Sequence, residues 1–111
     1  MRKIVGLICL FLLLVGCEVN IGGQNFYDQI NEIEKQMEAQ DWEEVVTKSE
    51  ELKRLFKKDK WKLQFLGDED EYESLYEAIN KLIAAGKGED EANIRMELSI
   101  IHTYIEDIYS L

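Results

Sequence analysis

Apolar residues recur at helical spacing along most of the chain. Phe26, Ile30, Ile33 and Met37 are separated by four, three and four residues, which places them on one face of a helix over about 26–39. Three later stretches keep the same period. Their inward-facing stripes consist of Trp42, Val45, Val46, Ser49, Leu52, Leu55 and Phe56, then of Tyr72, Leu75, Tyr76, Ile79, Leu82 and Ile83, and then of Ala92, Ile94, Leu98, Ile101, Ile105 and Ile108. No stretch shows sustained two-residue alternation, so the pattern predicts an all-α protein.

Residues that favour helix starts and helix ends separate the four predicted helices. Asp41 is suited to cap the second helix, because its carboxylate can accept hydrogen bonds from the free amides of the first turn. Gly86 and Gly88 mark the break before the fourth helix, over 89–109, because glycine permits the left-handed turn that ends many helices. Residues 57–70 join the second and third helices. We expect a small antiparallel four-helix arrangement of two helical hairpins, either tetratricopeptide-like or an up-down bundle.

The two expected hairpins resemble each other at an offset of 46 residues. The paired positions are Phe26 and Tyr72, Ile30 and Tyr76, Ile33 and Ile79, Met37 and Ile83, Ala39 and Ala85, Val46 and Ala92, Leu52 and Leu98, and Leu55 and Ile101. This pairing indicates an internal duplication. The alternative is that any two amphipathic helices align at some offset.

The beginning of the chain has the organisation of a bacterial secretory signal. Arg2 and Lys3 precede an apolar run over 4–15, which is shorter than the roughly 20 residues that span a bilayer. The run ends in a segment that resembles the lipobox of bacterial lipoproteins, made of Leu14, Val15, Gly16 and Cys17. That resemblance implies that Cys17 is acylated. We expect a signal peptide over 1–16, a lipidated cysteine with a short tether over 17–25 and a helical domain over 26–111. The alternative is an uncleaved anchor helix.

Charge and length narrow the range of functions. The chain has 111 residues, 13 basic and 23 acidic side chains and a formal net charge of −10, with no proline. Such a chain holds one small domain. Its acidity argues against a nucleic-acid partner, because phosphate contacts need a basic face. Cys9 and Cys17 both lie in the leader, so the helical domain can hold neither a disulfide nor a cysteine metal site.

One basic cluster stands out in this acidic chain. Its members are Lys53, Arg54, Lys57, Lys58, Lys60 and Lys62, with Trp61 and Phe65 interleaved. If the first helix leaves the membrane and the second returns, the cluster lies near the lipid, where basic residues and an interfacial Trp61 are favourable. We take these cations and Trp61 as candidate contacts to a membrane or partner, with Tyr104 and Tyr109 as weaker candidates. The alternative is that the cations stabilise the end of the second helix through its dipole, with Trp61 in the core.

Residues able to carry catalysis or bind a metal are sparse. His102 is the only histidine, and no Glu-x-x-His pair or Gly-x-Ser-x-Gly turn accompanies it. The acidic run over 68–73 lacks the glycine and glutamate positions of a calcium-binding EF-hand loop, and acidic residues are favoured at helix starts. We therefore expect a non-enzymatic protein with no catalytic residue, no metal site and no cofactor.

Several of these segments together resemble a known family. They are the acidic helix start at Asp41, Trp42, Glu43, Glu44 and Val45, the lysine-rich stretch with Trp61, and the helix from Tyr72 to Ile83. In this order the chain resembles the small bacterial family of the domain of unknown function 4363. The resemblance implies a helical envelope protein and no particular chemistry. Two departures are the lipobox, where members often carry a plain membrane anchor, and residues 67–71, where members tend to carry a histidine.

These observations favour a membrane-anchored bacterial lipoprotein that faces outward from the cell membrane. We expect it to act as a non-catalytic helical interaction module, held to membrane lipid through acylated Cys17 and contacting an envelope or membrane protein. The alternative function is binding of a small ligand in a cavity between the hairpins, lined by the aromatic residues Trp42, Phe56, Tyr72 and Tyr76.

Overall fold

The computed structural model describes residues 23–110, which form five α-helices and, within that range, no strand. The helices are α2 (Gln24–Glu38), α3 (Trp42–Lys58), α4 (Lys60–Leu66), α5 (Glu69–Lys87) and α6 (Glu91–Tyr109). The prediction of an all-α protein is confirmed for these residues. The stretch 57–70, expected only to join two helices, instead ends α3, forms α4 and begins α5. Leu14, Val15, Gly16 and Cys17, with most of the predicted tether, lie outside the described residues.

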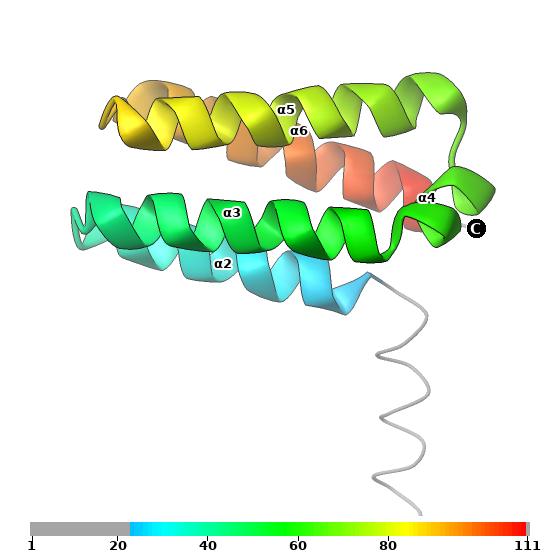
Figure 1. Ribbon diagram of the computed structural model, residues 1–111, viewed down its shortest axis with the longest axis horizontal. Helices are drawn as coiled ribbons and strands as arrows, with labels where there is room; N and C mark the ends of the chain where they lie inside the picture. The colour runs from blue at the N-terminus through cyan, green and yellow to red at the C-terminus, as the bar shows by residue number, and fades with distance from the viewer. Residues whose placement is uncertain (1–22, 111) are drawn as a thin grey trace, which may run out of the picture.

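The four long helices run antiparallel to their neighbours in the chain (Figure 1). α2 packs on α3, α3 packs on α5, and α5 packs on α6. The contact between α2 and α6 closes the bundle and is the sparsest of the four. As a consequence, the start of α2, the end of α3, the start of α5 and the end of α6 lie at one end of the bundle, together with α4.

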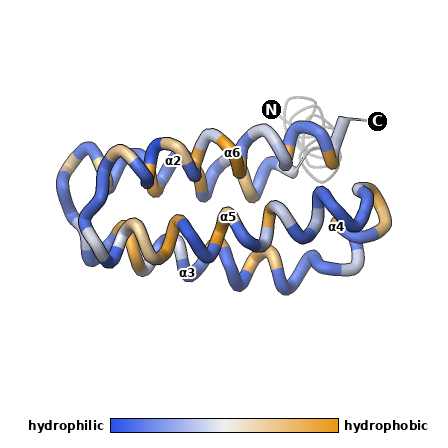
Figure 2. The backbone as a smooth tube through the Cα atoms, turned by 90° about the horizontal axis from the view of Figure 1, so that it is seen from above, coloured by the Kyte–Doolittle hydropathy of each residue, from blue (hydrophilic) through white to orange (hydrophobic). Residues whose placement is uncertain are grey.

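Apolar and polar residues are interspersed along each helix in Figure 2, and the buried apolar residues form a single core. The buried apolar side chains all lie between Phe26 and Ile108. Gly86 belongs to this packing, because a Cβ there would lie 3.2 Å from Val46 Cγ2 and 3.3 Å from Val45 Cγ1. Since the described residues share one contiguous core, we expect this part of the chain to fold on its own.

The turns that follow α2 and α5 have the same hydrogen bonds. In the first, Gln40 N donates to Met37 O and Asp41 N donates to Gln36 O; in the second, Glu89 N donates to Gly86 O and Asp90 N to Ala85 O. This is the Schellman pattern, with Gln40 (φ 57°) and Glu89 (φ 52°) in the left-handed conformation. The expectation that glycine supplies this conformation is wrong, because Gly88 has φ −86° and Gly86 lies inside α5.

The equivalent turns place the internal repeat at an offset of 49 residues, which corrects the offset of 46 expected from the pattern. Asp41 and Asp90, 49 positions apart, cap α3 and α6 by accepting from Glu44 N and Asn93 N. At this offset every residue buried in α2 and α3 aligns with a residue buried in α5 or α6. The pairs are Phe26 and Leu75, Ile30 and Ile79, Ile33 and Leu82, Met37 and Gly86, Val45 and Ile94, Ser49 and Leu98, Leu52 and Ile101, and Phe56 and Ile105.

Helix starts differ slightly from the expected ones. α2 begins at Gln24, whose side-chain Nε2 donates to Asp28 Oδ1 at 2.9 Å, so the last two residues of the predicted tether belong to the helix. α5 begins at Glu69 because Asp68 and Glu71 form a reciprocal capping box. That box confirms the helix-start interpretation of the acidic run for these two residues.

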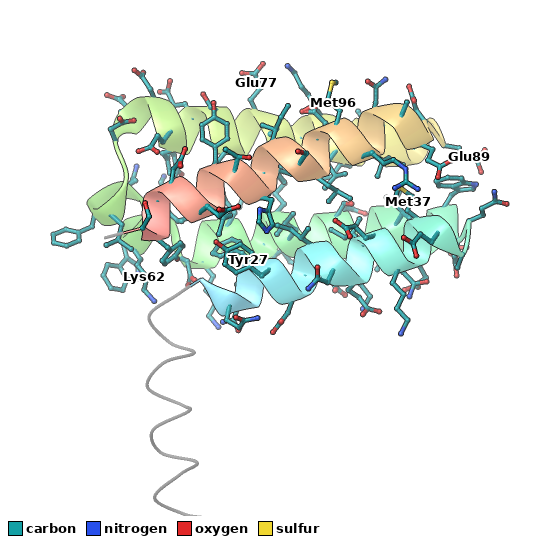
Figure 3. All side chains as sticks on the ribbon, turned by 180° about the vertical axis from the view of Figure 1, so that it is seen from behind. Tyr27, Met37, Lys62, Glu77, Glu89 and Met96 are labelled. Carbon is teal, nitrogen blue, oxygen red and sulfur yellow. The ribbon has the colours of Figure 1, made fainter. Side chains whose placement is uncertain are left out.

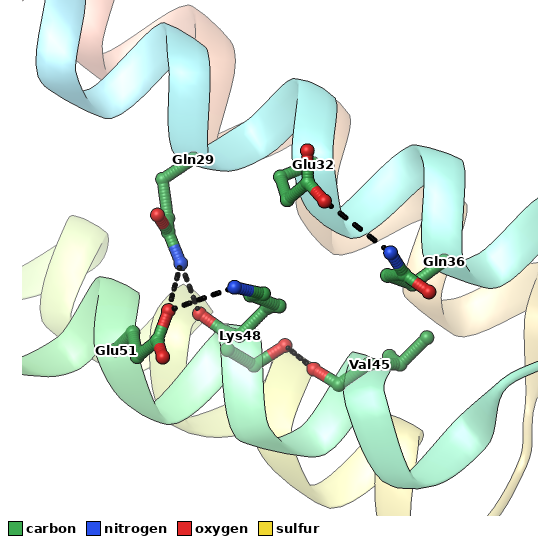
Figure 4. Close-up of polar contacts among 7 residues, drawn as sticks. Gln29, Glu32, Gln36, Val45, Lys48 and Glu51 are labelled. Atoms are coloured by element: carbon green, nitrogen blue, oxygen red, sulfur yellow. Dashed lines mark hydrogen bonds and ion pairs between the residues drawn. The ribbon is translucent and has the colours of Figure 1, made fainter.

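One polar bridge joins α2 to α3 within the first hairpin (Figure 4). Gln29 Nε2 donates to Lys48 O at 2.8 Å and to Glu51 Oε2 at 3.1 Å. The hydrogen bond from Gln29 is the largest cause of a lowered pKa of Glu51. Burial opposes it, and the charge of Lys48, 3.5 Å from the carboxylate, adds to the lowering. The bridge holds the two helices in one register.

Candidate functional site

α4 presents two aromatic side chains to solvent. Trp61 is 69% exposed and Phe65 is 84% exposed. Because they are four residues apart on a helix, they lie on one face. Lys60 and Lys62 flank Trp61 in sequence, and Lys62 Nζ lies 5.8 Å from the centroid of the Trp61 ring. We call these four residues the α4 surface.

Backbone hydrogen bonds and a buried leucine hold α4 in place. Asp59 ends α3 and begins α4, accepting from Leu63 N at 3.0 Å, and Gly67 N donates to Leu63 O at 2.9 Å. The Leu63 side chain is fully buried in the core. The opposite side of this short helix, which carries the aromatic pair, therefore points outward.

The α4 surface lies at the end of the bundle where the described chain begins. Lys62 borders a small recess together with Gly23, Asn25, Asp59 and Tyr109. Figure 3 shows Lys62 at this end, with Glu89 and Met37 toward the opposite end. Residues from α2, α4 and α6 thus meet around the point at which the chain enters the domain.

The structure divides the predicted basic cluster into two parts. Lys57 and Lys58 lie in the last turn of α3, as the dipole interpretation expects. The other part of that interpretation is wrong, because Trp61 is not in the core. Lys60 and Lys62 belong to the α4 surface, whereas Lys53, Arg54 and Lys57 line a groove together with residues of α5.

A basic groove of about 330 Å³ lies on the surface where α3 packs on α5. Its lining includes Lys53, Arg54 and Lys57 of α3, joined by Asn80 and Lys87 of α5 and one acidic residue, Glu50. Sequence reasoning missed Asn80 and Lys87, because nothing local in the chain indicates which α5 residues meet the α3 cations. The groove is a second surface with an excess of positive charge.

Three of the four aromatic residues proposed to line a ligand cavity, Phe56, Tyr72 and Tyr76, pack on one another. The Phe56 ring stacks on Tyr72 with centroids 4.8 Å apart and on Tyr76 with centroids 5.5 Å apart. Lys53 Nζ lies 5.5 Å from the centroid of the Tyr76 ring. Trp42 is 14 residues before Phe56 on the same helix, about 21 Å along its axis. These four residues do not share one cavity wall.

The two tyrosines named as weaker contacts lie at the edge of the core. Tyr104 and Tyr109 are partly buried against the core cluster. Burial, and then the charge of Asp59 and the neighbouring Tyr27, raise the pKa of Tyr109 to about 12. Neither side chain is as exposed as Trp61, which leaves both as weaker contact candidates.

His102 takes part in a small polar cluster at the sparse α2–α6 contact. Its Nδ1 lies 2.6 Å from Glu106 Oε1, and its ring packs on Tyr27 with centroids 5.0 Å apart. Burial, and then the charge of Glu106, raise the pKa of Tyr27. An open groove of about 270 Å³ beside it is lined by Glu34, Met37, Arg95, Leu98, Ser99 and His102.

A further groove lies between α5 and α6. It has a volume of about 470 Å³ and is lined by Lys81, Ala84, Ala85, Gly88, Asp90, Asn93, Met96 and Glu97. Glu97 is only 5% exposed. Glu97 lies three residues after Ile94 and four before Ile101, and this helical spacing is the sequence signal that could have identified its carboxylate as inward-facing. A hydrogen bond and the charge of Glu77, and then the charge of Glu97, raise the pKa of Lys81.

Two further properties apply to residues 23–110. Within this range no three or more His, Cys, Asp or Glu side chains are grouped so that they could hold a metal ion. None of the helices in the same range is both long and apolar enough to cross a membrane.

The sequence of the chain matches a known protein family. The sequence model of the family described as "Domain of unknown function (DUF4363)" matches residues 18–111. No curated protein and no solved structure matches the chain. The matched segment contains every described helix and each residue of the α4 surface.

Proposed function

The chain belongs to the DUF4363 family, and from this premise we propose that it is a bacterial lipoprotein acting as a helical interaction module. It is anchored through acylated Cys17 at the outer face of the cytoplasmic membrane. Its role is to contact an envelope or membrane protein rather than to catalyse a reaction. The four long helices form an up-down bundle of two repeated hairpins that serves as the platform.

One observation carries this proposal. Gly23, where the described chain begins, lies six positions after Cys17 and shares a recess with Lys62 of the α4 surface. Six residues span at most about 22 Å when fully extended. A lipid on Cys17 would therefore keep this end of the bundle close to the membrane, with the turns at Gln40 and Glu89 facing away from it.

Metabolic labelling with a radioactive fatty acid tests the anchor. Wild-type protein expressed in bacterial cells should incorporate the label and fractionate with membranes, because two or more acyl chains hold a protein stably on a bilayer. Cys17→Ala should lose both properties. Cys9→Ala is the matched control, since it removes the other cysteine of the leader and should retain the label. Equal labelling of wild type and Cys17→Ala would rule out the lipoprotein.

Crosslinking in intact cells tests the interaction. We expect wild-type protein to capture a defined membrane or envelope protein that Cys17→Ala captures far less, because anchoring concentrates the module at the membrane. Capture of the same protein at the same yield by both variants would show that the anchor does not serve the interaction.

The α5–α6 groove, with its buried Glu97, supports small-ligand binding as a second candidate function. A ligand that binds only the folded state raises the melting temperature. A screen of small cationic and apolar compounds by thermal shift tests this function, with Glu97→Gln as the variant expected to abolish any response. A panel without a shift would remove this candidate.

A further inference from the structure

We propose that the α4 surface is a docking site for an anionic phospholipid bilayer. Trp61 and Phe65 enter the interfacial zone of the bilayer, while Lys60 and Lys62 meet the headgroup phosphates. This inference rests on the proposed function, because it assumes that the module works at a membrane. It adds a contact that does not depend on the lipid at Cys17 and that fixes the orientation of the bundle.

The first argument is the exposure of two large aromatic side chains on one short helix. Phe65, at 84% exposed, gains almost nothing from the core of its own domain. Single exposed apolar residues are common, but an adjacent pair rimmed by charged residues forms a patch of the kind found at interaction sites. Trp61 combines an apolar ring with one hydrogen-bond donor, which suits the boundary between headgroups and hydrocarbon.

The second argument is that α4 cannot rotate to bury this pair. Leu63 fills the core on the opposite side of the helix. Gly67, directly after α4, lies so close to α6 that a Cβ there would be 2.9 Å from Ile108 Cγ1. Because both contacts are part of the core packing, the aromatic pair is presented on a rigid platform, which reduces the entropy lost on binding.

The third argument concerns the occupant of the surface. Lys62, at the edge of the patch, lines the same recess as Gly23, where the described chain begins. Lysines adjoin Trp61 on both sides in an otherwise acidic protein of net charge −10. Positive charge around an aromatic wedge is complementary to anionic headgroups, and lysine stems can lie along the apolar surface while their ammonium groups reach phosphate.

The acidic start of α5 opposes this contact. Asp68 and Glu71 are engaged in the capping box, so their carboxylates already accept backbone hydrogen bonds. Glu69 and Asp70 in the first turn of α5 are exposed. Their repulsion from anionic lipid weakens the docking, so removing their charge should strengthen it.

Tryptophan fluorescence of the soluble fragment that begins at Glu18 provides the test. The chain has two tryptophans, and Trp42 lies near the opposite end of α3. The Trp42→Phe variant leaves Trp61 as the reporter, and its emission should shift to the blue on vesicles of equal phosphatidylglycerol and phosphatidylcholine. Trp61→Phe, which retains Trp42, should show no such shift. Vesicles of phosphatidylcholine alone should give a response at least tenfold weaker.

Single substitutions separate the contributions of the lysines and of the aromatic side chains to vesicle binding. Lys60→Gln and Lys62→Gln should each weaken binding about fivefold, as expected for one basic residue at an anionic surface. Phe65→Ala should weaken it by about tenfold. Lys81→Gln on α5 is the matched lysine control and should bind like wild type. The double change Glu69→Gln and Asp70→Asn should bind more tightly.

Three results would overturn the inference. They are an unshifted Trp61 emission on the anionic vesicles, equal binding to both vesicle types, and equal losses for Lys62→Gln and Lys81→Gln. The fragment lacks Cys17, so these results are independent of fatty-acid labelling. Failure of the vesicle test with normal labelling of Cys17 would leave the lipoprotein in place and remove only the α4 docking site.

Discussion

The ring of Tyr109 covers Gly23. A Cβ at Gly23 would lie 2.8 Å from Tyr109 Cδ2, and Gly23 itself has φ +66°, in the left-handed region. The Tyr109 ring also packs on Phe26, with centroids 6.3 Å apart. Gly23 and Phe26 therefore pack against the last turn of α6, at the end of the bundle that carries α4.

Replacing Gly23 should therefore destabilise the domain. Gly23→Ala should lower the free energy of unfolding by about 1–2 kcal/mol from the left-handed conformation alone, with a further loss from the clash. Urea denaturation measures this loss. In a Tyr109→Ala background the clash is gone, so the same substitution should cost less than it does in wild type. Equal losses in both backgrounds would show that the ring does not press on Gly23.

The environment of Tyr109 predicts a loss of stability in alkali. Its pKa in the folded protein is about 12, above the value of about 10 for an exposed tyrosine. Between these two values the unfolded chain releases the proton and the folded chain retains it, so the free energy of unfolding falls as the pH rises. Melting temperatures at pH 9 and pH 11 measure this effect, and the decrease should be smaller in Tyr109→Phe. An identical decrease in both proteins would contradict the prediction.

Close approach of α5 to α3 at Gly86 predicts intolerance of larger residues there. Gly86→Leu should cost about 1–3 kcal/mol, because Val45 and Val46 leave no room for the side chain. Gly88→Leu is the control. A Cβ at Gly88 meets only Ala84 O at 3.6 Å and Ala85 O at 3.8 Å, so its cost should stay within about 0.5 kcal/mol. Chemical denaturation distinguishes the two, and similar costs would contradict the packing.

Substitution of two residues of α4, only two positions apart, should affect stability very differently. Leu63→Ala should lower the free energy of unfolding by about 2–5 kcal/mol, because it empties a buried site. Phe65→Ala should change it by less than about 0.5 kcal/mol, because that side chain is exposed. Urea titration followed by circular dichroism gives both values. A large loss for Phe65→Ala would mean that this side chain belongs to the core rather than to the α4 surface.

Because the turns after α2 and α5 have the same conformation, glycine at the left-handed position should stabilise both to a similar extent. Gln40→Gly and Glu89→Gly should each raise the free energy of unfolding by about 0.5–1 kcal/mol, because glycine adopts the left-handed conformation without a steric penalty. Ala39→Gly is the matched control, since Ala39 has φ −76° and gains nothing. Thermal unfolding reports all three. A gain at one turn and a loss at the other would show that the turns differ.

The internal repeat shows which features the apolar periodicity predicts and which it does not. The stripe at Phe26 and Ile30 correctly predicts which face of α2 is buried, because burial repeats with the helical period. The offset of 46 paired Ile30 with Tyr76, which is exposed, whereas the structure pairs it with the buried Ile79. Offsets that differ by three residues give nearly the same helical phase, so the turns are needed to select 49.

By itself the sequence determined the helical class and the cap at Asp41, because each depends on neighbours within one or two turns of the chain. Only the tertiary structure decided that Trp61 is exposed, since seven residues of α4 are too few for a periodic stripe to assign its faces. It also decided that Lys87 meets Lys53 and Arg54 across a groove and that Tyr109 covers Gly23. Such contacts join residues tens of positions apart and arise from how the helices pack, which no local pattern specifies.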